Sequence, residues 1–234
     1  MTLSENFYKA FLFLVSADSE LYNIIFLSLF ISGLATFFAT TIALPFGVWL
    51  AITKFPMRGV LVSLLNSLTG LPPVVLGLSV YLLLSRAGPL GSFGILYTPT
   101  AMILTQIILV FPIIAATIRI VAEEHYTHVS PYYSMLNIPK YKVVISMLYD
   151  LRFMIFSSIM VGLGRALSEV GAMLIVGGNI DGHTRIMTTA ISLETGRGNL
   201  SFALAIGAVL LSIIIIINSL SAYTNTLARK YYGL

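Results

Sequence analysis

The sequence predicts an all-α integral membrane protein with about five transmembrane helices. The chain has 234 residues, of which 58% are hydrophobic and only 9% are charged. A soluble domain carries roughly a quarter charged residues, so this chain has too few to cover a surface that faces water. Several long intervals also lack charged residues, and each exceeds the roughly 20 residues that an apolar helix needs to cross a bilayer.

These intervals place the helices, with one helix expected in each. The span after residue 152 is apolar except for Arg165 and Glu169, and it still has the length of a crossing. Together the spans form a single transmembrane domain over residues 21–228. We expect the five helices at about 21–52, 59–85, 98–120, 153–178 and 200–223.

Neither end of the chain is expected in the bilayer core. Residues 1–20 lack the basic start of a signal peptide and have only a short apolar run. They predict an amphipathic segment that lies at the membrane interface. Residues 229–234 are expected to form a cytoplasmic tail. The chain contains no cysteine, which excludes disulfides and thiolate metal sites.

Lysine and arginine predict the orientation, because cytoplasmic loops carry an excess of both. One side of the predicted topology holds eight of them: Lys54, Arg58, Arg119, Lys140, Lys142, Arg152, Arg229 and Lys230. The other side holds four: Lys9, Arg86, Arg185 and Arg197. The first side is therefore predicted to be cytoplasmic, with the N-terminus outside and the C-terminus inside. This asymmetry explains the basic composition, so no nucleic-acid partner is predicted.

Pro72 and Pro73 lie about midway along the second expected span. Two adjacent prolines remove backbone donors and force a bend. In lipid, the carbonyls that lose their partners must find others in neighbouring helices or in a wet cavity. The pair therefore indicates either the lining of a transport pathway or a kink that serves packing.

Arg165 and Glu169 are full charges inside a small and apolar stretch. Residues four apart lie on one face of a continuous helix and can form an ion pair. Charges at membrane depth are costly, so they pair or face a cavity. Two interpretations remain open: a pair that pins helices together, and a pair that lines the route of a polar solute. Small residues beside the pair favour close helix packing: Gly164, Ser168, Gly171 and Ala172.

Nothing in the sequence predicts an enzyme or a bound cofactor. A phosphate-binding loop needs a Gly-Lys step at a helix start, and no lysine here follows a glycine. The serines at membrane depth lack a histidine base, because all three histidines fall in loops. Ligand-type side chains cluster at residues 123–128, but that loop is predicted to be wet, and we interpret the cluster as a solvated helix end. No catalytic residue and no metal site are predicted.

Two longer stretches resemble a known family. GRALSEVGAMLIVGGNIDGHTRIMTTAISLET (164–195) looks like the signature of permease subunits of type I ATP-binding-cassette importers for oxyanions, and it is closest to tungstate permeases. GLPPVVLGL (70–78) resembles the double-proline element of molybdate and sulfate permeases. The resemblance implies the type I importer permease fold in a prokaryotic cell membrane. It also implies a homodimer, two cytoplasmic ATPase subunits that bind ATP and Mg²⁺, and an external binding protein for the anion.

The resemblance also assigns the predicted cytoplasmic loop 121–152 to coupling with the ATPase. With the family's glycine position placed on Asn137, Pro131, Tyr132 and Tyr133 replace its Glu-Ala-Ala, so the motif itself is degenerate. Asn is compatible with that position, because Asn and Gly both tolerate a left-handed backbone at a helix end. The expected coupling residues are Tyr132, Tyr133, Ser134, Leu136, Asn137, Ile138 and Lys140. A plain tyrosine-rich interfacial loop is the alternative.

The end of the fourth span predicts an outer gate. Gly177, Gly178 and Asn179 offer flexible backbone and an amide that could contact an anion. With Arg165 and Glu169 they form the expected pathway, and Pro72, Pro73, Gly164, Ser168 and Gly171 are the expected kink and packing residues. The external loop that follows, 179–200, is expected to contact the binding protein through Asp181, His183, Thr184 and Arg185.

The sequence therefore indicates a permease subunit that imports an oxyanion, with tungstate favoured by resemblance. Molybdate or sulfate import by the same mechanism is the nearest alternative. A different class, a secondary transporter or channel that works without ATP, is also open. Many secondary transporters carry internal repeats, and no repeat is found here. A purely structural membrane anchor would leave the Gly-rich loop unexplained.

Overall fold

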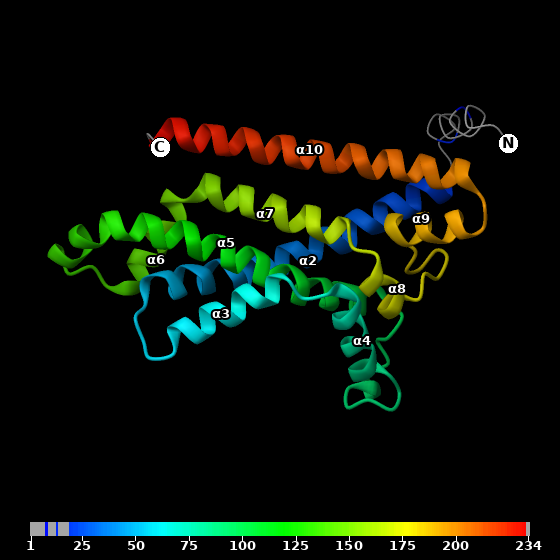
Figure 1. Cartoon of the computed structure of the whole chain (residues 1–234), viewed down its shortest axis with the longest axis horizontal. Coiled ribbons are helices and arrows are strands. Elements are labelled where there is room, and N and C mark those ends of the chain that lie inside the picture. Colours follow the sequence, from blue (N-terminus) through cyan, green and yellow to red (C-terminus); the bar gives the residue numbers. More distant parts are fainter. Residues whose placement is uncertain (1–7, 9–12, 14–18, 233–234) are drawn as a thin grey trace. The chain divides into compact units, whose positions relative to one another are not determined.

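A computed structural model describes residues 8, 13 and 19–232, with side chains as far as Leu227. Every regular element in this part of the chain is a helix, which confirms the predicted all-α membrane class (Figure 1). The described residues form two compact units. Unit 1 contains 19–35, 72–106 and 165–216, and unit 2 contains 36–71, 107–164 and 217–232. The predicted interfacial segment 1–20 lies almost entirely outside the described residues.

Three helices are long and apolar enough to cross a membrane. They are α2 (Ser19–Ile52), α5 (Pro99–Met135) and α10 (Leu200–Tyr232). Two broken pairs meet the same criterion only when each is taken as one span, which brings the count to as many as five in the described chain. The pairs are α3 (Arg58–Thr69) with α4 (Pro73–Leu84), and α6 (Lys140–Asp150) with α7 (Arg152–Leu167).

The proline pair interrupts the second span, as predicted. Helix α3 ends at Thr69, and α4 begins at Pro73 after Pro72, whose backbone is extended. Proline is well tolerated at the first position of a helix, because the N–H that it lacks would have no partner there. The two prolines therefore start a new helix, and the span bends by 99° between α3 and α4.

The structure corrects the predicted continuous span over 153–178. Helix α7 ends at Leu167, residues 168–170 are not helical, and a short helix, α8, runs over Gly171–Gly177. At its other end α7 follows α6 at an angle of 75°. Side chains from distant parts of the sequence hold this break, as described below, which is why local pattern did not reveal it.

Both long loops expected from the sequence contain helices. In the predicted cytoplasmic loop 121–152, α5 continues to Met135 and α6 follows after a short turn. In the predicted external loop 179–200, α9 covers Met187–Gly196 and its first turns are buried. Ser28 of α2 accepts a hydrogen bond from the Met187 N–H at 2.7 Å, and this side-chain cap stabilises the start of α9.

Glycines allow close helix contacts in unit 1. A Cβ on Gly77 of α4 would lie 2.7 Å from the Ala172 Cα of α8, and one on Gly171 would lie 2.5 Å from a Val74 methyl group. Small residues let two backbones approach this closely in membranes. Beside this contact lies a core formed by Ile31, Met102, Ala172, Met173 and Ile186.

Unit 2 has its own close contacts and polar ties. Gly47 of α2 faces the Ala115 carbonyl of α5, where a Cβ would lie only 2.9 Å away. The hydroxyls of Ser157 in α7 and Ser221 in α10 are hydrogen-bonded at 2.7 Å. Such interhelical hydrogen bonds stabilise helix packing where water is absent.

Adding one methyl group should test the α4–α8 contact. We expect Gly77→Ala to lower the free energy of unfolding by about 1–3 kcal/mol, because the new Cβ would overlap the backbone of Ala172. The matched control is Gly33→Ala in α2, where nothing lies within 4 Å of the added Cβ. Thermal unfolding in detergent measures both variants, and equal melting temperatures would contradict the close contact.

Candidate functional site

The centre of the candidate site in unit 1 is the helix break at residues 168–170. Helix α7 ends just before it, and the first hydrogen bond of α8 runs from the Leu174 N–H to the Val170 carbonyl at 2.9 Å. Breaking a helix leaves carbonyls without their usual amide partners. In a membrane these carbonyls must be satisfied by other protein groups or by water in a cavity.

Two buried side chains satisfy carbonyls at the break. Gln106 of α5 donates from Nε2 to the Ala166 carbonyl at 3.1 Å. Thr188 of α9 donates from its hydroxyl to the Glu169 carbonyl at 2.8 Å. Helices α5 and α9 thus hold the break from two separate parts of the sequence.

Arg165 and Glu169 do form the predicted ion pair, with Nη2 and Oε2 3.5 Å apart. The predicted helical geometry is wrong, however, because Arg165 is in the last turn of α7 and Glu169 lies in the break. The contact therefore ties the end of α7 to the break, and it does not itself join two helices. The side chain of Glu169 is only 6% exposed, whereas that of Arg165 is 42% exposed. Of the two, the arginine can reach a solute more readily.

The break also separates the small residues that were expected to form one stripe. Gly164 is in α7, Ser168 is in the break and Gly171 begins α8. Gly171 and Ala172 make the close helix contact expected of the set, against Val74 and Gly77 of α4, whereas nothing lies within 4 Å of a Cβ on Gly164. The close packing shown for these small residues therefore lies at the start of α8.

The predicted outer-gate residues form a tight turn at the end of α8. Gly178 and Asn179 both have left-handed backbones, with φ of 69° and 50°. The hydroxyl of Thr184 fixes this turn, because it donates to the Gly177 carbonyl at 2.6 Å and accepts from the Ile180 N–H at 2.9 Å. The Asn179 Oδ1 is buried and accepts no hydrogen bond from the described residues.

Tyr97 covers Gly178 of the turn. A Cβ on Gly178 would lie 2.8 Å from the Tyr97 ring, and the Tyr97 N–H donates to the Val176 carbonyl at 3.0 Å. A side-chain hydrogen bond with Tyr81 raises the pKa of Tyr97 above its ordinary value. Tyrosine is already neutral at physiological pH without this shift, so the turn has a neutral polar cover.

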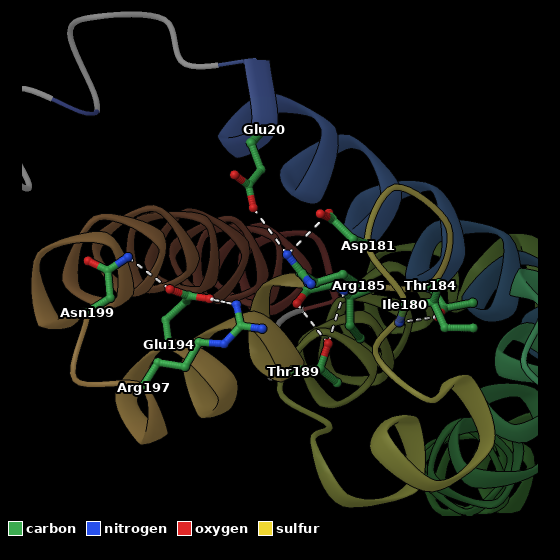
Figure 2. A network of polar contacts seen from close by, with 10 residues as sticks. Glu20, Ile180, Asp181, Thr184, Arg185, Thr189, Glu194, Arg197 and Asn199 are labelled. Atoms are coloured by element: carbon green, nitrogen blue, oxygen red, sulfur yellow. Dashed lines mark hydrogen bonds and ion pairs between the residues drawn. The ribbon is translucent and has the colours of Figure 1, made fainter.

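Figure 2 shows the polar network that follows the turn. Arg185 is buried, and its Nη1 lies 3.2 Å from both a Glu20 and an Asp181 carboxylate oxygen. A cavity of about 480 Å³ lies beside these three residues. Glu194 of α9 is also buried and accepts from Arg197 at 3.0 Å and Asn199 at 2.9 Å. These contacts fix the start of α2 and the α9–α10 turn.

Of the residues predicted to contact a binding protein, the structure exposes two. Asp181 and His183 are exposed, whereas Thr184 and Arg185 are buried by the contacts just described. Asp181 and His183 therefore form the accessible part of the predicted surface, and the exposed carboxylate of Glu20 lies next to it through Arg185.

In unit 2, the predicted coupling residues lie at the turn between α5 and α6. Asn137 has φ of 48°, a left-handed backbone of the kind that both Asn and Gly tolerate. The Ile138 N–H donates to the Tyr133 carbonyl at 3.1 Å, the long-range bond of a Schellman turn. Tyr132 and Leu136 are about 70% exposed (67% and 71%), so the helix tip presents apolar side chains. The adjoining groove, about 400 Å³, is lined by the remaining predicted residues and others: Ile52, Tyr126, Tyr133, Ser134, Asn137, Ile138, Lys140 and Val143.

Residues of the acidic and histidine cluster pair with other side chains in unit 2. Glu123 contacts Arg58 at 2.9 Å and Arg119 at 2.6 Å. His125 lies 3.6 Å from Asp150 of α6. No group of three or more potential metal ligands is found among the described residues. These contacts instead link α3 and α6 to α5.

Gln106 and Thr188 are the site residues that the sequence reasoning missed. Gln106 is the only residue of its kind in the chain and lies in the uncharged interval 87–118. A polar amide in such an interval indicates a specific partner, because an unsatisfied amide in lipid is costly. This signal could have drawn attention to Gln106, but it could not have named Ala166 as its partner.

Comparison with known proteins identifies relatives over almost the whole chain, although no protein-family model matches it. The tungstate uptake system permease protein of Peptoclostridium acidaminophilum is 40% identical over 217 residues, which cover 93% of this chain and 95% of the relative. The chain belongs to the anion permease family of ATP-binding-cassette transporters. The tungstate uptake permease of Campylobacter jejuni is 34% identical over 218 residues, 92% of this chain and 90% of the relative. A probable anion permease of Haloferax volcanii is 34% identical over 207 residues, 86% of this chain and 89% of the relative.

A double substitution should distinguish the two interpretations of the ion pair in this permease. If the pair is structural, Arg165→Met leaves the buried Glu169 carboxylate unpaired and destabilises the protein by about 2 kcal/mol. Glu169→Met should cost less, because Arg165 is partly exposed, and the double variant should be more stable than Arg165→Met alone. Thermal unfolding measures all three variants. Equal loss in the single and double variants would contradict a structural pair.

Proposed function

We propose that the chain is the membrane subunit of an ATP-driven importer that carries tungstate into the cytoplasm. The transporter contains two copies of this chain, two cytoplasmic ATPase subunits and an external binding protein that delivers the anion. The choice of tungstate as the substrate rests on the 40% identity, over nearly the full length, to a tungstate uptake permease. Molybdate and sulfate are the competing anions to be tested.

The turn between α5 and α6 supports the coupling role. Its left-handed Asn137 ends α5 sharply, so that apolar side chains project from the helix tip. Apolar residues exposed at a helix tip favour contact with another protein. Because no lysine in the chain follows a glycine, ATP binding through a phosphate loop belongs to the partner subunit.

The turn at residues 177–179 is the proposed outer gate, and the short helix α8 separates it from the helix break at 168–170. With the N-terminus outside, this turn faces the external side and the Asn137 turn faces the cytoplasm. The Asn179 amide and the partly exposed Arg165 supply hydrogen-bond donors for a passing oxyanion. Glu169 neutralises Arg165 in the resting protein, so the pathway attracts the anion weakly and does not trap it.

Reconstitution tests the whole proposal. The permease is placed in liposomes with its ATPase and binding protein, and tungstate uptake is measured with and without ATP. We expect uptake only with ATP and the binding protein present, and less inhibition by added sulfate than by added molybdate. ATP-independent uptake by the permease alone would replace this proposal with a secondary transporter or channel.

Substitution of Asn137 tests the coupling turn. We expect Asn137→Trp to allow ATP hydrolysis but to reduce uptake at least tenfold, because a bulky side chain is strained at φ of 48° and blocks the groove. Asn137→Gly is the matched control, since glycine adopts this backbone freely. If Asn137→Trp keeps the normal ratio of uptake to hydrolysis, the turn is not the coupling element.

Substitution of Asn179 tests the outer gate. Asn179→Gly removes the amide but permits the left-handed backbone at φ of 50°, whereas Asn179→Ala also strains the turn. We expect both variants to lower tungstate uptake several-fold, with the basal ATPase rate altered as well. Normal uptake and normal basal hydrolysis in Asn179→Gly would exclude a gating role for the amide.

A further inference from the structure

Gln106 has a fully buried side-chain amide in the N-terminal part of α5, and only its NH₂ group has a hydrogen-bond partner among the described residues. Its exposed fraction is 0%, and its Nε2 donates to the Ala166 carbonyl across the unit at 3.1 Å. Its Oε1 accepts no hydrogen bond from any described residue. An amide that leaves one atom unsatisfied in an apolar interior is costly, so its conformation here is only marginally favoured.

The bond that Gln106 makes competes with helix formation. In a continuous α-helix the Ala166 carbonyl would accept a hydrogen bond from the N–H of Val170, four residues later. In this structure the carbonyl accepts instead from Gln106 and, at 3.4 Å, from the Glu169 N–H. Gln106 therefore occupies the acceptor through which α7 would extend into α8.

At least one residue of the broken segment already has helical backbone angles. Val170 has φ of −109° and ψ of −57°, which lie in the right-handed helical region. Thr188 holds the next carbonyl in the same manner, since Glu169 would otherwise accept from Met173 N–H in a continuous helix. If the Ala166 and Glu169 carbonyls exchanged their side-chain donors for the N–H groups of Val170 and Met173, α7 and α8 would be joined.

We propose that Gln106 is a positioning residue for the gate and sets the balance between the broken and the continuous form of residues 165–177. When its amide holds Ala166, the helix is broken and Glu169 is buried beside Arg165. When the amide releases Ala166, the backbone closes into one helix, and Glu169 and the outer turn change position. This role rests on the proposed transport function, in which the outer turn contacts the anion.

Substitution of the amide by an apolar side chain of similar length tests the proposal. Gln106→Met cannot donate to Ala166, so the carbonyl keeps only the long bond from the Glu169 N–H at 3.4 Å unless the helix continues and the Val170 N–H reaches it. We expect amide hydrogen exchange over residues 168–173 to become about fivefold slower in the complete transporter in lipid nanodiscs, as judged by mass spectrometry. We also expect the maximal rate of tungstate uptake to fall several-fold, while the concentration that gives half-maximal uptake stays unchanged.

Thr105→Val is the matched control. Thr105 is equally buried in α5, but its hydroxyl bonds within its own helix, to the Ala101 carbonyl at 2.7 Å. The Thr105→Val variant should show the same amide hydrogen exchange and the same tungstate uptake as the unmodified protein. If Gln106 merely stabilised the fold, its replacement would make amide hydrogen exchange over residues 168–173 faster. The proposal predicts slower exchange.

Unchanged or faster exchange in Gln106→Met would overturn the proposal. Slower exchange with a normal maximal uptake rate would also overturn it, because the helix equilibrium would then have no part in transport. The hydrogen-exchange result does not depend on transport. Failure of the unmodified transporter to take up tungstate would refute the proposed substrate and leave the exchange measurement valid.

Discussion

The structure of unit 1 depends on how backbone carbonyls are satisfied where a helix is interrupted in an apolar environment. Water is unavailable in the bilayer core, so an interrupted helix is stable only if neighbouring groups supply donors. Here the donors are Gln106 and Thr188, which reach the Ala166 and Glu169 carbonyls. The break in turn fixes the position of Glu169 and the start of α8. The packing of α8 on α4 and the outer turn both follow from that position.

The ion pair between Arg165 and Glu169 also helps to hold the interrupted helix. Arg165 and Glu169 bridge the end of α7 and the break, so the pair adds an electrostatic contact where a backbone hydrogen bond is missing. Arg165 is the more exposed partner. It can therefore make the structural contact with Glu169 and still reach a passing anion. The two roles would then belong to different conformations of the same segment, and the pair would be a resting contact of the gate.

The features that depend on local chemistry could be predicted from the sequence. The adjacent Pro72 and Pro73 interrupt a helix and Asn137 has a left-handed backbone, as expected from the conformations open to proline and asparagine. The sequence could not place the break at 168–170, because the side chains that hold it are 60 and 19 residues away from the carbonyls they contact. Composition predicted that the loop expected to be external is polar, yet α9 is partly buried there and Ser28 of α2 caps its start.

The most direct test is a measurement of backbone conformation over residues 164–178 in a lipid bilayer. Solid-state NMR of isotopically labelled protein gives the Cα and carbonyl chemical shifts, which report helical conformation residue by residue. We expect helical shifts through Leu167, departure from helical values over 168–170, and helical shifts again over Gly171–Gly177. Uninterrupted helical shifts from 164 to 177 under resting conditions would contradict the side-chain-held break on which the proposed gate depends.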